Sequence, residues 1–220
     1  MFNCRRWLSA CAGLLLLLAF STTCFGDLII EVQDAQIAYG GSGYVDVLIS
    51  SDGSDNLAAF SADLKITTAD TANGGIRFGS PVIDASTVTS PFSYVFFGDS
   101  IGYTVNPTNG SFPDNEVNVS DATSSFTNVT VDSTKRLLTR LLVTHTGGTF
   151  AAVGETFTVG FLSGDFLDDS FLTGPGLAAA GQKYTGTITI VTPEPTTGGV
   201  LLCGGVGVVL WRRLRRHSRV

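Results

Sequence analysis

The sequence predicts an all-β fold for residues 27–192, an antiparallel sandwich of two sheets. Apolar and polar residues alternate along several short segments, a pattern typical of strands with one buried face. Clusters of Gly, Asn, Asp and Ser, such as YGGSG and NPTNG, separate these segments and indicate turns. Many short strands linked by turns favour one sandwich domain. A signal helix before this domain and a short transmembrane helix after it complete the predicted organisation.

Four segments show the alternation clearly: YVDVLIS (44–50), FSADLKIT (60–67), ETFTVGF (155–161) and KYTGTITIV (183–191). The leucines of KRLLTRLLVT (135–144) also fit a helix, but its threonines and the all-β setting favour a strand. In PFSYVFFGDS (91–100), we expect Phe92, Tyr94 and Phe96 to share the core face of a strand. Residues 108–134 contain few large apolar side chains, and we expect a long loop or an edge hairpin there.

The early part of this region resembles the jelly-roll sandwich of cohesin-type domains. A glycine-led turn, YVDVLIS, the polar loop SDGSDN and then LAAFSADLKIT look like the first strands of such a domain. The later RLLTRLLVT and GETFTVGF are similar to its paired strands near the end. The resemblance implies a binding or scaffold module that is not an enzyme.

The first 26 residues have the organisation of a secretory signal peptide. Arg5 and Arg6 precede an apolar run that contains five consecutive leucines, Leu14–Leu18. A short polar stretch and the small residue Gly26 follow, and we expect cleavage near Gly26. A retained membrane anchor is the alternative. The protein is therefore expected to be exported.

Cysteine and charge limit what the exported domain can be. The four cysteines all lie in the two ends, at positions 4, 11, 24 and 203, so the domain has no disulfide and no cysteine nucleophile. Residues 27–192 contain six basic and eighteen acidic residues, a net charge of −12. Such a surface repels phosphate backbones and anionic lipids, which excludes nucleic acid as a partner.

No catalytic motif is present, and we predict no catalytic residue. His145 is the one histidine of the domain, and neither a G-x-S-x-G nor an H-E-x-x-H motif occurs. We expect His145 to be a surface or strand-end residue. No pair of carboxylates stands out for glycoside hydrolysis among so many acidic residues. A secreted hydrolase of carbohydrate or ester remains the alternative function.

No cofactor is expected, with calcium as the one open alternative. The loops SDGSDN, with Asp52 and Asp55, and SGDFLDDS, with Asp165, Asp168 and Asp169, offer the oxygen ligands that calcium prefers. Neither has the twelve-residue EF-hand spacing. Turn stabilisation by Asp and Asn is the favoured interpretation.

The last 28 residues, 193–220, combine three features. Pro193, Glu194 and Pro195 come first, a 14-residue run of apolar residues and glycine (198–211) follows, and an arginine-rich end (212–220) closes the chain. At 1.5 Å per residue the run spans about 21 Å as a helix, less than the roughly 30 Å bilayer core. Five of its residues are glycine, which weakens a helix further. Cytoplasmic arginines would leave the sandwich outside.

This order of features resembles the PEP-CTERM sorting signal of Gram-negative-type bacteria. The resemblance implies recognition by an exosortase, a membrane-embedded processing enzyme, and delivery to the cell surface or extracellular polymer after transient anchoring in the inner membrane. It assigns Pro193, Glu194 and Pro195 to the recognition motif. The stop-transfer cluster would be Arg212, Arg213, Arg215 and Arg216. An ordinary single-span anchor is the alternative.

The sequence therefore predicts an exported, non-enzymatic surface or matrix protein. Its sandwich is expected to bind polysaccharide or another protein in an extracellular polymer or biofilm.

Overall fold

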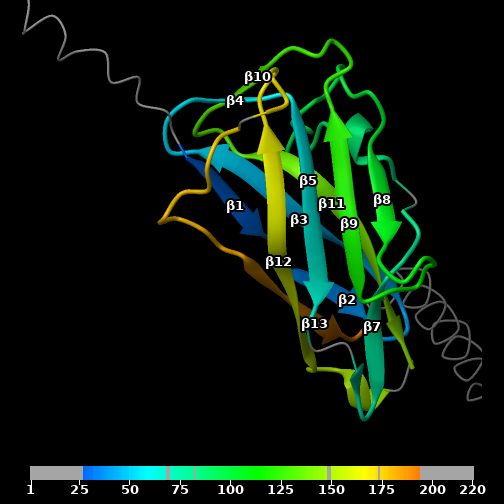
Figure 1. The fold of residues 1–220 in the computed structure, drawn as a ribbon. Helices are drawn as coiled ribbons and strands as arrows, with labels where there is room; N and C mark the ends of the chain where they lie inside the picture. The colour runs from blue at the N-terminus through cyan, green and yellow to red at the C-terminus, as the bar shows by residue number, and fades with distance from the viewer. Residues whose placement is uncertain (1–26, 68–69, 82, 148–149, 173, 194–220) are drawn as a thin grey trace, which may run out of the picture.

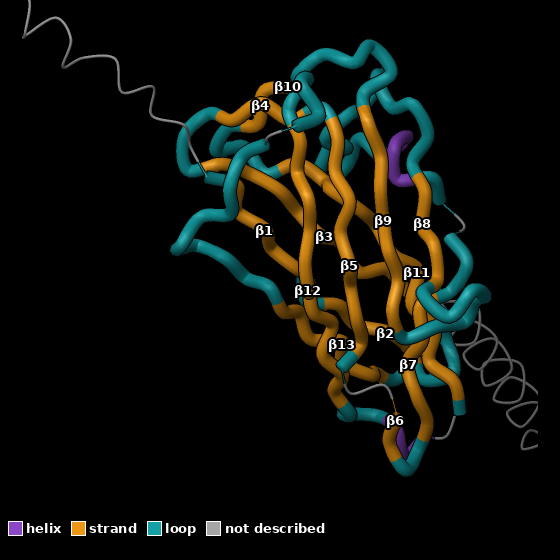
Figure 2. Tube along the Cα trace, viewed as in Figure 1, coloured by secondary structure: helices purple, strands orange, loops and turns teal. Residues whose placement is uncertain are grey.

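The computed structural model describes residues 27–67, 70–81, 83–147, 150–172 and 174–193. Within them the regular secondary structure is almost entirely β-strand, as predicted (Figure 2). The elements are β1 (Leu28–Val32), β2 (Ala35–Ala38), β3 (Ser42–Ser51), β4 (Asp55–Leu57), β5 (Ala59–Ile66), β6 (Asp70–Thr71), β7 (Gly74–Phe78), the 3-10 helix η1 (Ala85–Thr87), β8 (Thr104–Pro107), β9 (Glu116–Ala122), β10 (Val129–Val131), β11 (Arg136–Thr146), the 3-10 helix η2 (Phe150–Ala152), β12 (Thr156–Leu167) and β13 (Thr185–Val191).

Two large sheets form a sandwich, and a small ribbon lies at one end. The first sheet has the order β1-β3-β11-β7-β6, the second has the order β2-β13-β12-β5-β9-β8, and β10 pairs with β4. In Figure 1 the second sheet faces the viewer, with the first behind it. The predicted two-sheet sandwich is confirmed, and KRLLTRLLVT is a strand, β11.

The alternation seen in the sequence becomes the core between the sheets. Along β5, Phe60, Ala62, Leu64 and Ile66 are buried and the residues between them are half-buried. Val45 and Val47 of β3 contribute in the same way, as do the alternate residues of β12 and β13. A domain of this length buries roughly 68–70% of the surface of its unfolded chain, so the core can hold it without disulfides.

One pair of strands departs from the predicted antiparallel arrangement. The first strand of the domain changes sheets at Gln33–Asp34: β1 pairs with β3, whereas β2 runs parallel to β13 in the other sheet. The Gln33 N–H donates to the carbonyl of Asp46 at 2.9 Å and so keeps the crossing attached to the first sheet. The crossing joins the two sheets along one edge.

One sequence expectation holds in part and another is wrong. For residues 108–134, an edge hairpin is present, because β9 pairs with the edge strand β8, but β8 begins earlier, at Thr104, and β9 also pairs with β5 inside the six-stranded sheet. Residues 91–100 are not a strand: Tyr94 makes one isolated bridge to Leu137, and turns follow. Tyr94 and Phe96 are nevertheless buried, and Phe92 packs half-buried against the core, as expected.

Within the described residues, no helix is long and apolar enough to cross a membrane. The predicted signal helix (1–26) and the predicted transmembrane segment (198–211) lie outside those residues.

Candidate interaction surface

The outward side of the six-stranded sheet presents a continuous polar surface. Cross-strand registers place polar residues of β8, β9, β5 and β12 opposite one another on this side, because side chains alternate between the two faces of a strand. We call this surface the polar face. Its members are Thr104, Asn106, Glu116, Asn118, Ser120, Ser61, Asp63, Lys65, Ser163 and Asp165.

Hydrogen bonds fix the centre of the polar face. The Nδ2 of Asn118 donates to the Oγ of Ser61 at 3.0 Å and to the Oδ1 of Asp63 at 2.8 Å. From the other side, the Ser163 hydroxyl donates to the Oδ2 of Asp63 at 2.7 Å. The Asp63 carboxylate therefore joins three strands. The side chains are held in one arrangement before any partner binds.

An ion pair borders this network. The Nζ of Lys65 lies 2.8 Å from the Oε2 of Glu116, and both side chains are partly exposed. An exposed pair of this kind contributes about 0–1 kcal/mol to folding. Its more direct effect is to place one charge of each sign on an otherwise neutral or acidic face.

A β-bulge adds an apolar residue to this side of the sheet. The pairing of β12 with β5 shifts between Phe161 and Ser163, so the intervening Leu162 is an extra residue. Phe161 is buried, whereas Leu162 is 51% exposed. Bulges redirect side chains and are common beside functional sites. Here the bulge presents a leucine next to the polar network.

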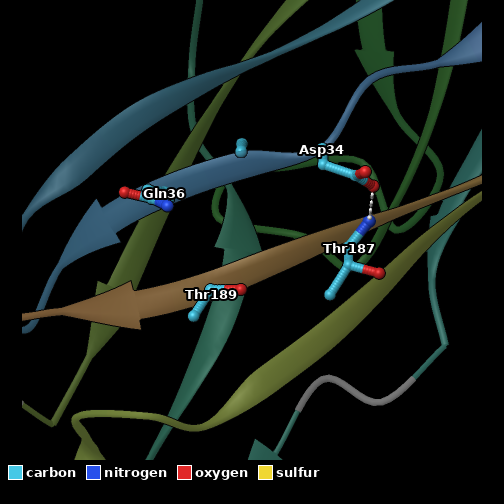
Figure 3. Close-up of a pocket in the computed structure, with 5 residues that line it drawn as sticks. Asp34, Gln36, Thr187 and Thr189 are labelled. Carbon is cyan, nitrogen blue, oxygen red and sulfur yellow. Dashed lines mark hydrogen bonds between the residues drawn. The ribbon is translucent and has the colours of Figure 1, made fainter.

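A shallow pocket of about 430 Å³ lies where this sheet side continues to β13 and β2. Figure 3 shows Gln36, Thr187 and Thr189 along the two strands with Asp34 at one end. The Oδ1 of Asp34 accepts the Thr187 N–H at 2.8 Å and its Oδ2 accepts Lys183 at 3.0 Å. These two bonds, the first above all, lower the pKa of Asp34. The pocket is polar, and its carboxylate already has partners.

His145 is a strand-end residue, one of the two expected positions, but it is not on the surface. Its position near the end of β11 was expected, but its side chain is only 2% exposed. Nδ1 accepts the Gly40 N–H at 2.9 Å, and Nε2 is buried without a hydrogen-bond partner. The ring packs against Phe157 at a centroid distance of 6.3 Å. This environment favours packing and leaves the ring no access to a substrate.

Only the last part of the predicted acidic loop SGDFLDDS is a turn. Asp165 lies within β12, on the polar face opposite Ser61. The Asp168 side chain accepts the N–H and hydroxyl of Ser170, and the Asp169 N–H donates to Asn128 at 2.9 Å. Over the described ranges, no group of three or more His, Cys, Asp or Glu side chains could hold a metal ion. Calcium binding by this loop stays the alternative to the favoured turn interpretation.

Asp55 in the other acidic loop is buried and accepts the Ser51 hydroxyl at 2.6 Å. Burial raises its pKa, and the charges of Asp27 and Asp52 act in the same direction.

The predicted sorting residues are placed only at their start. Pro193 follows β13, which ends at Val191. Glu194, Pro195 and the arginines Arg212, Arg213, Arg215 and Arg216 lie outside the described residues.

The polar network and the bulge were not recognisable as a site in the sequence. The alternation did predict which residues of β5 face outward. The bulge left no signal, because it depends on how β12 pairs with a strand about 100 residues earlier.

Comparison with known proteins identifies the fold. No protein-family model matches the chain, and no curated protein matches it. Among solved structures, a type I cohesin–dockerin complex from Clostridium thermocellum gives a TM-score of 0.52 at 16% identity, covering 76% of this chain and 95% of that chain. The sixth cohesin of scaffoldin B from Acetivibrio cellulolyticus, solved with a Cel5 dockerin, gives 0.50 at 16% identity, covering 74% and 99%. The sandwich therefore has a cohesin-like fold.

Proposed function

We propose that this chain is an exported, non-enzymatic cell-surface or extracellular-matrix protein whose sandwich binds another protein through the polar face. The observation that carries this proposal is the polar face itself. It is a sheet surface with fixed hydrogen-bonding groups, and Leu162 is exposed beside them. Protein interfaces combine such polar contacts with a few apolar anchors.

The comparisons support a protein as the partner. Both cohesins described above were solved in complexes with a dockerin. The acidity of the domain, six basic against eighteen acidic residues over 27–192, disfavours anionic polymers. Polysaccharide recognition commonly uses exposed aromatic strips, and Tyr94 and Phe96 of the dense aromatic segment are buried instead.

The chemistry of the described residues favours binding over hydrolysis. A general base must reach the group from which it takes a proton, and His145 is enclosed by Gly40, Phe157 and the chain near Gly74. Asp63 and Glu116, the carboxylates at the centre and border of the polar face, are already engaged by neighbouring side chains. No observation specifically favours the hydrolase.

We further propose that residues 193–220 act as a PEP-CTERM sorting signal. The order of Pro193-Glu194-Pro195, the apolar run 198–211 and the arginine-rich end supports this proposal. The start of this segment is compatible with it, because Pro193 lies two residues after the end of the last strand, β13. An exosortase would then be the second partner of the chain.

A pull-down with matched variants tests the binding proposal. The exported protein, immobilised, should retain one saturable protein from the envelope of its own host. Leu162→Arg should abolish retention by placing a charge at the apolar contact. Tyr44→Arg should leave it intact, because Tyr44 is exposed on β3 in the other sheet. Equal retention by both variants would contradict the assignment of the polar face.

A further inference from the structure

Three exposed apolar side chains gather at one end of the sandwich. Phe126 lies in the loop after β9 and is 57% exposed, while Phe171 and Leu172 lie in the loop after β12 and are 37% and 87% exposed. The two phenylalanine rings contact each other nearly edge-on, with centroids 6.1 Å apart. We call these three residues the apolar tip. Burying apolar side chains is favourable, and the folded chain leaves part of this gain unused at the tip.

The backbone of the tip is unusual at two positions. Phe126 has φ of 53° and Phe171 has φ of 54°, the left-handed region that bulky residues rarely adopt. They are the only non-glycine residues with positive φ in the described part of the chain. Strained conformations of this kind persist where the surroundings impose them, and they are concentrated at binding sites. The positive φ values of Phe126 and Phe171 leave their rings exposed, so this strain does not place either ring in the core.

Hydrogen bonds hold both loops in place. The Asp99 carboxylate accepts the Ser124 hydroxyl, and it also accepts the N–H and hydroxyl of Ser125, at 2.6–2.9 Å. The Phe126 N–H donates to the carbonyl of Thr123 at 3.2 Å, and the Phe171 N–H donates to that of Asp168 at 3.0 Å. These bonds fix the backbone that presents the two phenylalanine rings, and such preorganisation lowers the entropic cost of an interface.

Position and charge restrict the partner. The apolar tip and the C-terminal segment lie at opposite ends of β12. The loop of Phe171 follows Leu167, where β12 ends, whereas Thr156 at the start of β12 pairs with Thr189, near the end of β13. At about 3.3 Å per residue, β12 separates the tip from the exit of the C-terminal segment by about 35 Å. The loop after β12 carries Asp168 and Asp169 beside the tip. Its one basic residue, Lys183, lies next to β13 and pairs with Asp34.

We propose that the apolar tip is a second protein-docking surface, distinct from the polar face, for a partner with an apolar groove bordered by Lys or Arg. Charge complementarity supports this choice, because Asp168 and Asp169 lie in the loop of Phe171 and the Asp99 carboxylate contacts Ser124 and Ser125 in the loop of Phe126. A second copy of the chain would bring the same carboxylates together. An anionic membrane would be repelled.

A defined probe tests the proposal on the exported protein. A fluorescent amphipathic helical peptide of Leu and Lys supplies an apolar stripe with basic borders, and anisotropy measures its binding. We expect saturable binding that weakens as salt rises. The variant Phe126→Asn/Phe171→Asn/Leu172→Ser should weaken binding at least tenfold. Asn tolerates positive φ, so the melting temperature of this variant should stay unchanged or rise.

Controls separate the possible outcomes. Phe97→Ser removes an exposed aromatic residue of a neighbouring loop and should change the affinity less than twofold, as should Leu162→Arg on the polar face. Because Leu162→Arg disrupts only the polar face, it distinguishes failure of the docking proposal for the apolar tip from failure of the proposed function. The proposal is overturned if the triple variant binds the peptide as the parent does. Comparable binding of a Leu/Glu peptide or of anionic vesicles by the parent would equally overturn it. So would self-association of the parent that the triple variant loses, or a large fall in the melting temperature of the triple variant.

Discussion

Asp121 shows how a single buried polar residue can hold a loop of this domain against a sheet. Its buried carboxylate accepts the Tyr94 hydroxyl at 2.7 Å, the Ser100 hydroxyl at 2.5 Å and the N–H groups of Gly102 and Ala122. Burial, and then the bond to this carboxylate, raises the pKa of Tyr94 far above its usual range. The residue thus fastens the loop before β8 to the six-stranded sheet.

Replacing Asp121 should therefore cost much more than replacing an exposed acid. Asp121→Ala would leave the buried Tyr94 hydroxyl without its partner, and we expect a loss of about 2–4 kcal/mol in the free energy of unfolding. Tyr94→Phe should cost about 1 kcal/mol. The exposed Asp169→Ala should stay within about 0.5 kcal/mol. Urea denaturation measures all three, and equal midpoints for Asp121→Ala and Asp169→Ala would contradict the role of Asp121.

Asp114 gives a prediction with a definite pH dependence. Burial acts to raise its pKa, but hydrogen bonds from the N–H and Nδ2 of Asn109, both at 2.7 Å, and from other backbone groups lower it overall. A lowered folded-state pKa stabilises the fold above the unfolded value of about 3.9, and this stabilisation is lost as pH falls through the folded value.

Asn109→Ala should therefore reduce the free energy of unfolding by about 1–2 kcal/mol at pH 7. The difference from the parent should shrink as pH falls from 4 toward 2, where Asp114 is protonated. Asn115→Ala is the control. Asn115 donates to Asp114 through its backbone N–H, which alanine keeps, so this variant should not show the same pH-dependent difference. A difference that does not depend on pH would show that the carboxylate of Asp114 is not responsible.

At the scale of the elements, the change of sheets between β1 and β2 depends on a close approach by β13. A Cβ added to Gly186 would lie 2.5 Å from the carbonyl oxygen of Gln33 and 2.9 Å from Val32. Only glycine lets this strand pass the crossing at that distance. The glycine thus permits the parallel pairing of β2 with β13.

Gly186→Ala should accordingly destabilise the domain by about 1–3 kcal/mol through overpacking. Gly160→Ala is the matched control. Gly160 lies in β12, one register pair from the pair that β12 forms with Gly186 of β13, and its added Cβ would meet nothing nearer than 3.9 Å. Thermal unfolding of the two variants compares them directly. Similar melting temperatures would mean that the crossing can move at little cost.

The sequence predicted those elements whose alternation separates apolar from polar residues. Five segments became strands, including the ambiguous β11. Within the expected loop or edge hairpin, the position of β9 was not predicted, because its inward residues include Asp121 and its remaining residues are polar or small apart from Val117 and Val119. The crossing at Gln33–Asp34 could not be predicted, since it depends on pairing with a strand about 150 residues later.

The candidate site was predicted only in part for the same reason. Alternation places Ser61 and Asp63 on the outward side of a strand, but their bonds to Asn118 and Ser163 arise from tertiary pairing. Nor does the sequence reveal that Leu162 bulges outward or that Phe126 adopts positive φ. Local pattern determines the face of a residue, and long-range register determines its neighbours.

At the scale of the whole molecule, the proposed sorting segment and the proposed binding surfaces differ in charge and in position. The sandwich is acidic, whereas five arginines cluster after residue 211. The described part of the C-terminal segment leaves the sandwich opposite the apolar tip. Under the proposed sorting function, one end would be processed at the membrane while the sheet face and the tip stay available outside.

Changing the tripeptide Pro193-Glu194-Pro195 to three alanines should separate export from release. Insertion depends on hydropathy and positive charge, so export should continue. Release should fail, and the protein should stay in the membrane fraction with its arginines attached. Neutralising Arg212, Arg213, Arg215 and Arg216 should instead give soluble protein with its full tail, because the stop-transfer charge is lost. Fractionation and intact mass distinguish the products, and parental behaviour of both variants would refute the sorting proposal.

Site-specific photo-cross-linking in the native host tests the central claim most directly, that the polar face binds a protein. A photoreactive phenylalanine analogue replaces Leu162 in one strain and Tyr44, in the other sheet, in a second strain. After illumination, position 162 should give one discrete adduct with a protein of the cell surface or matrix, and position 44 should give none. No adduct at 162, or the same adduct at both positions, would contradict the account.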